Sequence, residues 1–89
     1  MNYKTTVEVI LRSTILDVQG KAVENAIHSL GEKEISNVRV GKKITFNVAA
    51  ENNSNAEIIV KSICDKLLAN PIMEDFTFKI EQITNGLEN

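Results

Sequence analysis

The residue types that most often carry out catalysis are scarce in this chain. It has one histidine, His28, and one cysteine, Cys64. A histidine that acts as a general base needs a nucleophile or a second polar group beside it, and the sequence signals neither. One histidine and one cysteine also provide no ligand cluster for a metal ion. We therefore predict no catalytic residue and no metal or cofactor site in this chain, and we assign Cys64 to the core as a small apolar residue.

A local basic cluster offers a different kind of chemistry. Arg39, Lys42 and Lys43 are close together in the sequence, around Gly41. The glycine spacing of a phosphate-binding P-loop is absent, and no helix is expected directly after the cluster. Positive charge at an exposed turn suits polar docking to an acidic patch on another protein. Arg39, Gly41 and Lys42 are accordingly our candidate partner-contact residues, and solvated turn charges are the alternative interpretation.

Two predicted helices with clear end signals must position these residues. The first runs from Asp17 to Gly31, because Asp17 can cap the first turn and Gly31 can take the left-handed closing conformation. The second begins at Ser54, with Glu57 completing a capping box, and ends before Asn70-Pro71. Each helix has an apolar stripe at helical spacing. The stripes are Ala22, Val23, Ala26, Ile27 and Leu30 in the first helix, and Ala56, Ile59, Val60, Ile63, Leu67 and Leu68 in the second.

Four segments alternate between apolar and polar residues, which is typical of strands with one buried face. We predict strands at 3–12, 35–40, 44–48 and within 72–83, with the middle two joined as a hairpin through Gly41-Lys42. The element order is therefore strand, helix, strand, strand, helix, strand. It predicts an α+β fold, a ferredoxin-like β-α-β-β-α-β two-layer sandwich. In this fold a four-stranded antiparallel sheet carries two helices on one face.

Size and composition limit the classes of protein to consider. In a chain of 89 residues, we predict one domain over 1–83 and a frayed tail over 84–89. A domain of this size has a modest core, so assembly with other subunits is expected. A net charge of −2 and a shortage of aromatic residues predict no binding to nucleic acid or to a membrane. The lone cysteine, with no signal peptide and no bilayer-spanning apolar run, predicts a cytoplasmic protein.

The first helix also carries a family resemblance. The sequence LDVQGKAVENAIHSLG at 16–31 is similar to the first-helix signature of the PurS family. Two further blocks follow in the right order, VRVGK at 38–42 and LLANPIMEDF at 67–76, and the similarity covers nearly the whole chain. The chain departs from the family pattern at Val18, where proline is usual, and at Ser13-Thr14, where a glycine turn is frequent. These departures indicate a differently shaped connection before the helix.

The resemblance implies a role inside an enzyme complex. PurS-like subunits belong to phosphoribosylformylglycinamidine synthase, an ATP-consuming, glutamine-dependent ligase of purine biosynthesis. By resemblance, the chain associates with itself as a dimer or a dimer of dimers. It also assembles with a large synthetase subunit, PurL, and a glutaminase subunit, PurQ. The complex uses ATP, magnesium and glutamine, and this chain uses none of them. The implied function is to dock the glutaminase onto the synthetase and to assist ammonia transfer.

Two other classes of protein share the predicted architecture. One is a stand-alone regulatory domain that senses an amino acid or another small ligand, although such modules are normally fused to an enzyme. The other is a small acylphosphatase-like hydrolase, which needs an arginine-bearing phosphate loop after its first strand. The connection Ser13 to Leu16 offers no such loop. Thermal stabilisation by amino acids would favour the first class, and acyl-phosphate hydrolysis by the purified chain would favour the second.

Overall fold

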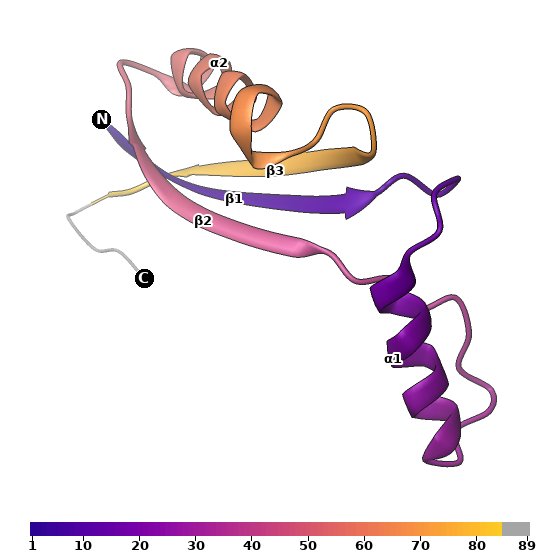
Figure 1. Ribbon diagram of the computed structural model, residues 1–89. Coiled ribbons are helices and arrows are strands. Elements are labelled where there is room, and N and C mark those ends of the chain that lie inside the picture. Colours follow the sequence, from indigo (N-terminus) through magenta and orange to yellow (C-terminus); the bar gives the residue numbers. More distant parts are fainter. Residues whose placement is uncertain (85–89) are drawn as a thin grey trace.

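The first strand in the chain is the central strand of the sheet. The computed structural model describes residues 1–84. β1 (Asn2–Leu11) pairs antiparallel with β2 (Lys42–Ala49) on one side and with β3 (Glu74–Gln82) on the other, which gives the order β2-β1-β3 (Figure 1). The predicted frayed tail, 84–89, lies outside the described residues except for residue 84.

The core forms between the sheet and the second helix. α2 (Asn53–Ile63) lies over one face of the sheet and continues as a π-helical turn, η1 (Cys64–Leu68) (Figure 1). Asn52 caps α2 by accepting a hydrogen bond from the amide of Asn55 at 2.9 Å, so the predicted cap at Ser54 is wrong by two residues. The buried apolar residues are Tyr3, Val7, Val9, Val48, Ala56, Val60, Cys64 and Ala69.

Cys64 occupies the core position that the sequence predicts. Its side chain is fully buried, and this burial raises the pKa of the thiol, with the nearby Asp65 carboxylate raising it further. Its carbonyl oxygen accepts a hydrogen bond from the amide of Ala69 at 3.0 Å, which closes the π-helical turn. The thiol is therefore held in its neutral, unreactive form, as expected of a structural cysteine.

The predicted strand at 35–40 is wrong. Among the described residues the sheet has three strands, and this segment lies beside α1 (Val18–Ser29) instead of joining the sheet (Figure 1). Asn37 has a φ angle of 62°, which interrupts an extended backbone. Two amides of the segment also donate to carboxylates at the start of α1 and within it, so they are not available to a neighbouring strand. Residues 1–84 form an α+β fold with three antiparallel strands and two helices, in place of the predicted four-stranded sandwich.

The first helix projects away from the sheet. Within α1, residues 18–29, Gly20 is the only buried residue, and the helix extends beyond the end of β1 (Figure 1). The prediction that both helices lie on one face of the sheet is therefore wrong. The radius of gyration is 16.9 Å, against about 12 Å for a compact domain of this length. The ends of the helix are as predicted, since Asp17 caps it and Gly31 has a φ angle of 101°.

Gly41 allows the chain to enter β2 close to the backbone of β1. A Cβ at this position would lie 2.6 Å from the carbonyl oxygen of Val9, so the backbone would have to shift. We expect Gly41→Ala to lower the free energy of unfolding by about 1–3 kcal/mol, measured as a lower urea midpoint. Gly31→Ala is the control, because a Cβ there meets no neighbour and only the positive φ opposes it. A smaller loss for Gly41→Ala than for this control would contradict the close approach.

Candidate functional site

The candidate residues gather where a projecting arm meets the sheet. We define the arm as residues 17–40, which comprise α1 and the segment that runs back beside it (Figure 1). The buried carboxylate of Asp17 lies at its base and accepts hydrogen bonds from the amides of Gly20 and Val40, both at 2.8 Å. These bonds hold the pKa of Asp17 below its ordinary value of 3.8. One carboxylate therefore caps the helix and fastens the returning chain.

Two further side chains of α1 fasten the returning chain along the arm. Glu24 accepts a hydrogen bond from the amide of Val38 at 3.1 Å, and this bond lowers the pKa of the Glu24 carboxyl. His28 Nε2 lies 2.5 Å from the carbonyl oxygen of Ile35. At Gly20 the approach is so close that a Cβ would overlap the carbonyl oxygen of Val38. The one histidine of the sequence therefore has a structural contact within the arm.

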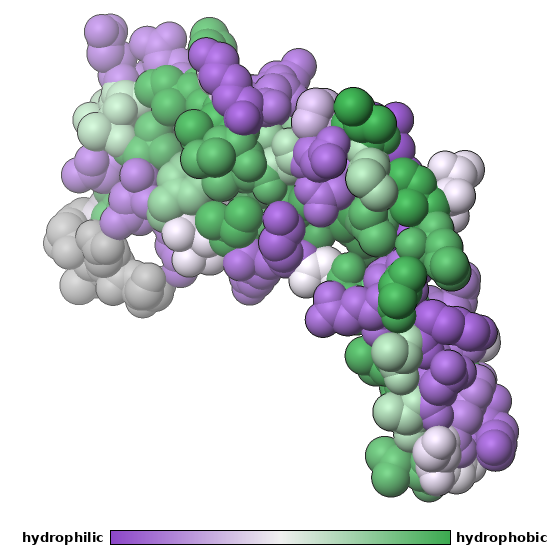
Figure 2. Space-filling model, viewed as in Figure 1, coloured by the Kyte–Doolittle hydropathy of each residue, from purple (hydrophilic) through white to green (hydrophobic). Residues whose placement is uncertain are grey.

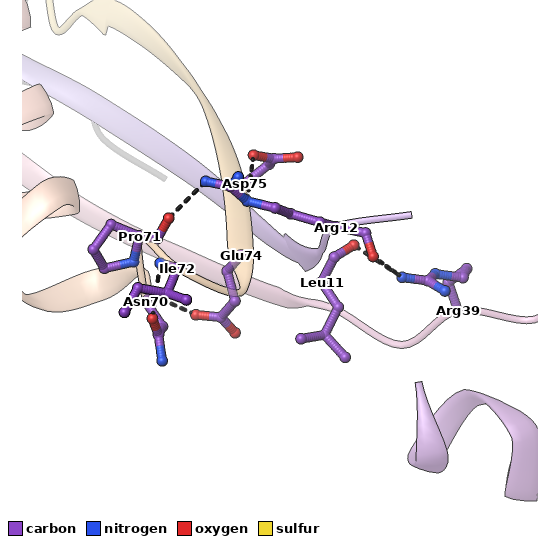
Figure 3. Close-up of polar contacts among 8 residues, drawn as sticks. All are labelled: Leu11, Arg12, Arg39, Asn70, Pro71, Ile72, Glu74 and Asp75. Atoms are coloured by element: carbon purple, nitrogen blue, oxygen red, sulfur yellow. Dashed lines mark hydrogen bonds and ion pairs between the residues drawn. The ribbon is translucent and has the colours of Figure 1, made fainter. Parts of the chain in front are cut away.

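Arg39 joins the arm to the end of β1. Its Nη2 donates to the carbonyl oxygens of Leu11 and Arg12, both at 2.9 Å, and its Nη1 donates to that of Ile15 at 3.2 Å. Figure 3 shows the guanidinium of Arg39 pointing at the backbone of Leu11 and Arg12. The side chain is half-buried. Its donors are thus engaged within the molecule, in contrast to the free hairpin-tip charge that the sequence suggests.

The other two partner-contact candidates follow directly at the start of β2. Gly41 is exposed but faces the β1 backbone closely, as described above. Lys42 pairs with Val9 in the sheet, and its ammonium group lies 4.0 Å from the carboxylate of Glu74. The Lys42 side chain remains 59% exposed. The structure therefore brings all three candidates together at the base of the arm, and Lys42 has the most accessible charge among them.

Arg12 braces the other side of the same junction. Its Nη2 donates to the carbonyl oxygen of Pro71 at 2.6 Å, and its Nε lies 3.5 Å from the carboxylate of Asp75 (Figure 3). Glu74 accepts a hydrogen bond from the amide of Asn70 at 2.7 Å. Arg12 and Pro71 are 59 residues apart in sequence. No spacing rule could have revealed this contact, and the sequence analysis missed it.

Both helices carry apolar side chains that residues 1–84 leave uncovered. On the arm, Val23 is 39% and Leu30 is 83% exposed, and on the second helical segment Ile59 is 47% and Leu67 is 72% exposed. Figure 2 shows apolar atoms at the surface both along the arm and over α2. Each of these residues belongs to a predicted apolar stripe, but the stripe of α1 does not face the sheet. Contiguous exposed apolar side chains of this kind mark interaction surfaces.

We expect the hydrogen bonds of Asp17 to be lost in acid. The pKa of Asp17 is lower in the folded chain than its ordinary value of 3.8. The stabilisation that its hydrogen bonds provide is therefore fully present above pH 3.8, and it is lost as the pH falls through the lower pKa of the folded chain. Amide exchange measured by NMR should show Val40 protected at neutral pH and unprotected well below 3.8. Asp17→Asn replaces one accepting oxygen with a donor, so it should lose this protection even at neutral pH. Unchanged protection in the variant would contradict this role.

Two kinds of structural feature are absent from residues 1–84. Among residues 1–84, no group of three His, Cys, Asp or Glu side chains is arranged to hold a metal ion. No helix in the same range has the length and apolar character needed to cross a membrane. The polar side chains at the base of the arm bond mainly to backbone groups of the chain itself. These hydrogen bonds stabilise the conformation of the chain where the arm meets the sheet.

The chain matches a known protein family over most of its length. The family model PurS, which describes phosphoribosylformylglycinamidine (FGAM) synthase, matches residues 4–82. The chain belongs to the PurS family. The PurS subunit of Bacillus subtilis FGAM synthase is 37% identical over 81 residues, which cover 91% of this chain and 95% of that protein. The PurS subunit of Methanocaldococcus jannaschii is 33% identical over 81 residues, covering 91% and 98%.

Solved PurS structures share the architecture. The Bacillus subtilis PurS structure superposes with a TM-score of 0.80 at 38% identity, covering 90% of this chain and 99% of that one. A chain of the PurLQS structure from Thermotoga maritima superposes with a TM-score of 0.83 at 31% identity, covering 90% and 98%. An alignment of this extent cannot leave out the arm. The projecting arm is therefore part of the fold that PurS subunits share.

Proposed function

We propose that this chain is the non-catalytic small subunit of FGAM synthase. In this role it docks the glutaminase subunit, PurQ, onto the ATP-dependent synthetase subunit, PurL. The observation that carries the proposal is the full-length similarity to a chain of the PurLQS structure. ATP, magnesium and glutamine are then used by the assembled complex and not by this chain. The amino-acid-sensing alternative receives no support from the relatives found.

Docking of this kind accelerates a reaction by holding the two active sites of the complex close together. Ammonia released by a glutaminase dilutes into solvent or takes up a proton unless it reaches the next site quickly. When two sites are held in register, the transfer becomes effectively intramolecular, which removes much of the entropic cost of encounter. In this proposal the small subunit contributes binding energy, and none of its side chains takes part in bond making or breaking.

A second copy of the chain is the partner that we propose for the exposed apolar stripes. Val23 and Leu30 on the arm are exposed in the single chain, although their spacing is that of a buried face. Fully burying one such side chain contributes about 1.5–3 kcal/mol, so covering a stripe can offset part of the cost of association. We propose a dimer, or a dimer of dimers, in which the stripe of α1 is covered by another copy.

Reconstitution of the complex tests the proposed function. PurL and PurQ from the same source are mixed with and without this chain, and product formation is followed with glutamine or with an ammonium salt. Glutamine-dependent turnover is expected to require the chain, whereas ammonia-dependent turnover by PurL is expected to proceed without it. If the chain changes neither rate and does not co-elute with PurL and PurQ, the proposal is wrong.

Lys42 remains our candidate for a direct partner contact at the base of the arm. Its exposed ammonium group favours an acidic patch on PurL or PurQ. We expect Lys42→Glu to weaken co-elution with the other subunits, and to do so more at low salt than at high salt. Lys33→Glu, which makes the same charge change at an exposed position far along the arm, is the control. Equal effects of the two variants would leave Lys42 without a specific role.

A further inference from the structure

The arm and the sheet have no apolar core in common. The buried apolar side chains described for residues 1–84 all lie outside the arm. α2 and the following turn η1, by contrast, are anchored on the sheet by fully buried side chains, Ala56 and Val60 in α2 and Cys64 in η1. Apolar packing therefore fixes the position of α2, but it does not fix the direction in which the arm points (Figure 1).

The chain passes twice between the sheet and the arm. It leaves β1 through residues 12–16 and returns to β2 at Gly41. Short connections of this kind act as a hinge when nothing ties them together, because a few backbone torsions can absorb a large change of angle. Arg39 lies where the two passages meet. Its guanidinium extends from the returning passage. It donates to the carbonyl oxygen of Leu11 at the end of β1 and to those of Arg12 and Ile15 in the outgoing passage.

The side chain of Arg39 suits this task. Its planar guanidinium donates several N–H groups in a fixed geometry, and hydrogen bonds from a charged donor are stronger than neutral ones. The acceptors, at 2.9–3.2 Å, are the carbonyl oxygens of Leu11, Arg12 and Ile15. Arg12 is itself held, because its side chain donates to the carbonyl oxygen of Pro71. A continuous line of polar contacts therefore runs from the arm to the turn before β3 (Figure 3).

We propose that Arg39 is a positioning residue that fixes the angle between the arm and the sheet. It thereby sets the orientation in which α1 is presented for assembly. The effect on assembly rests on the proposed function, whereas the effect on the angle concerns the chain by itself. A surface that is already held in its binding orientation loses less conformational freedom on association, so a fixed arm raises affinity without adding a contact.

The angle can be measured by pulsed electron paramagnetic resonance. Spin labels are placed on cysteines that replace Glu32 on the arm and Glu81 on β3, and an excess of unlabelled chain ensures that only distances within one chain are observed. Cys64 is buried and stays in place. The wild-type side chain at position 39 should give one narrow distance distribution, and Arg39→Gln should give a broad one. Lys33→Gln removes the same charge from an exposed position of the arm and should keep the distribution narrow.

A conservative variant and a melting experiment separate positioning from general destabilisation. Arg39→Lys offers a single ammonium group to three carbonyl groups, so its distribution should be intermediate in width. The melting temperature of the sheet should be the same in all of these variants, because the described core contains no residue of the arm. A narrow distribution in Arg39→Gln would overturn the positioning role.

The same variants are then added to PurL and PurQ. Arg39→Gln should raise the concentration of chain that gives half-maximal glutamine-dependent turnover by about tenfold, and should leave ammonia-dependent turnover unchanged. If assembly weakens while the distance distribution stays narrow, Arg39 is a direct contact and the inference is wrong. If the wild-type chain itself fails to support glutamine-dependent turnover, the proposed function is wrong, and the distance measurement still decides whether Arg39 fixes the angle.

Discussion

Replacing Val23 and Leu30 together with glutamate is expected to abolish self-association of the chain while its sheet stays folded. Both side chains lie on the exposed stripe of α1, so the isolated chain does not depend on their burial. In an apolar interface, each glutamate would lose its water without gaining a partner. We expect the dimer dissociation constant to rise by at least about 100-fold, as measured by sedimentation equilibrium.

A matched double variant on the opposite face of the same helix distinguishes the stripe from the added charge. Lys21→Gln with Asn25→Glu lowers the net charge by the same two units at exposed positions of α1 that lie off the stripe. This variant should associate like the wild-type chain. If both double variants weaken association equally, net charge governs it, and if neither does, another surface forms the dimer.

Val60→Asp is expected to unfold the chain at neutral pH. Val60 is fully buried between α2 and the sheet. A carboxylate there would have neither water nor a cationic partner, which costs at least about 4 kcal/mol. Native domains are stable by only about 5–15 kcal/mol in total. A domain with a core this small lies at the low end of that range, so the loss is comparable with its whole stability. Far-ultraviolet circular dichroism should show loss of helix and strand signal in this variant.

Ile58→Asp is the matched control for this experiment. It makes the same chemical change in the same helix, at a side chain that is 67% exposed. The free energy of unfolding should change by no more than about 1 kcal/mol. A folded Val60→Asp chain, or an unfolded Ile58→Asp chain, would show that α2 presents a different face to the sheet.

The ends of α1 can be predicted from the sequence because their signals are local. Asp17 caps an amide three residues away, and Gly31 follows the last turn of the helix with a positive φ angle. The buried face of β1 is equally predictable, because strict alternation places Val7 and Val9 on one side of a strand. Where a structure depends on neighbours in sequence, the residue types alone suffice.

The segment 35–40 is mispredicted as a strand because its alternation does reflect burial, but the element that it packs against is α1 and not a neighbouring strand. Val38 and Val40 alternate with polar residues and are half-buried, as they would be in a sheet. Their amides donate instead to Glu24 and Asp17, which are 14 and 23 residues away in the sequence. Alternation reports which side chains are covered, and it does not report what covers them.

The same limit applies to the candidate site. The stripe of α1 is correctly read as a surface to be covered, yet the covering element is not the sheet of the same chain. The charge of Arg39 likewise suggests a partner, and three backbone carbonyls of the same chain accept its hydrogen bonds. Long polar side chains reach distant backbone groups that no pattern of residue types encodes.

The strand order β2-β1-β3 also has a consequence for the nascent chain. β1 precedes both of its partners in the sequence, since Thr5 lies opposite Phe46 and Ile80. Pairings so distant in sequence form slowly, whereas the bonds of Asp17 and Glu24 close much shorter loops. Synthesis proceeds from the N-terminus, and on the ribosome the arm can therefore close before β2 emerges. During synthesis the apolar face of β1 therefore remains uncovered for longer than any other part of the sheet.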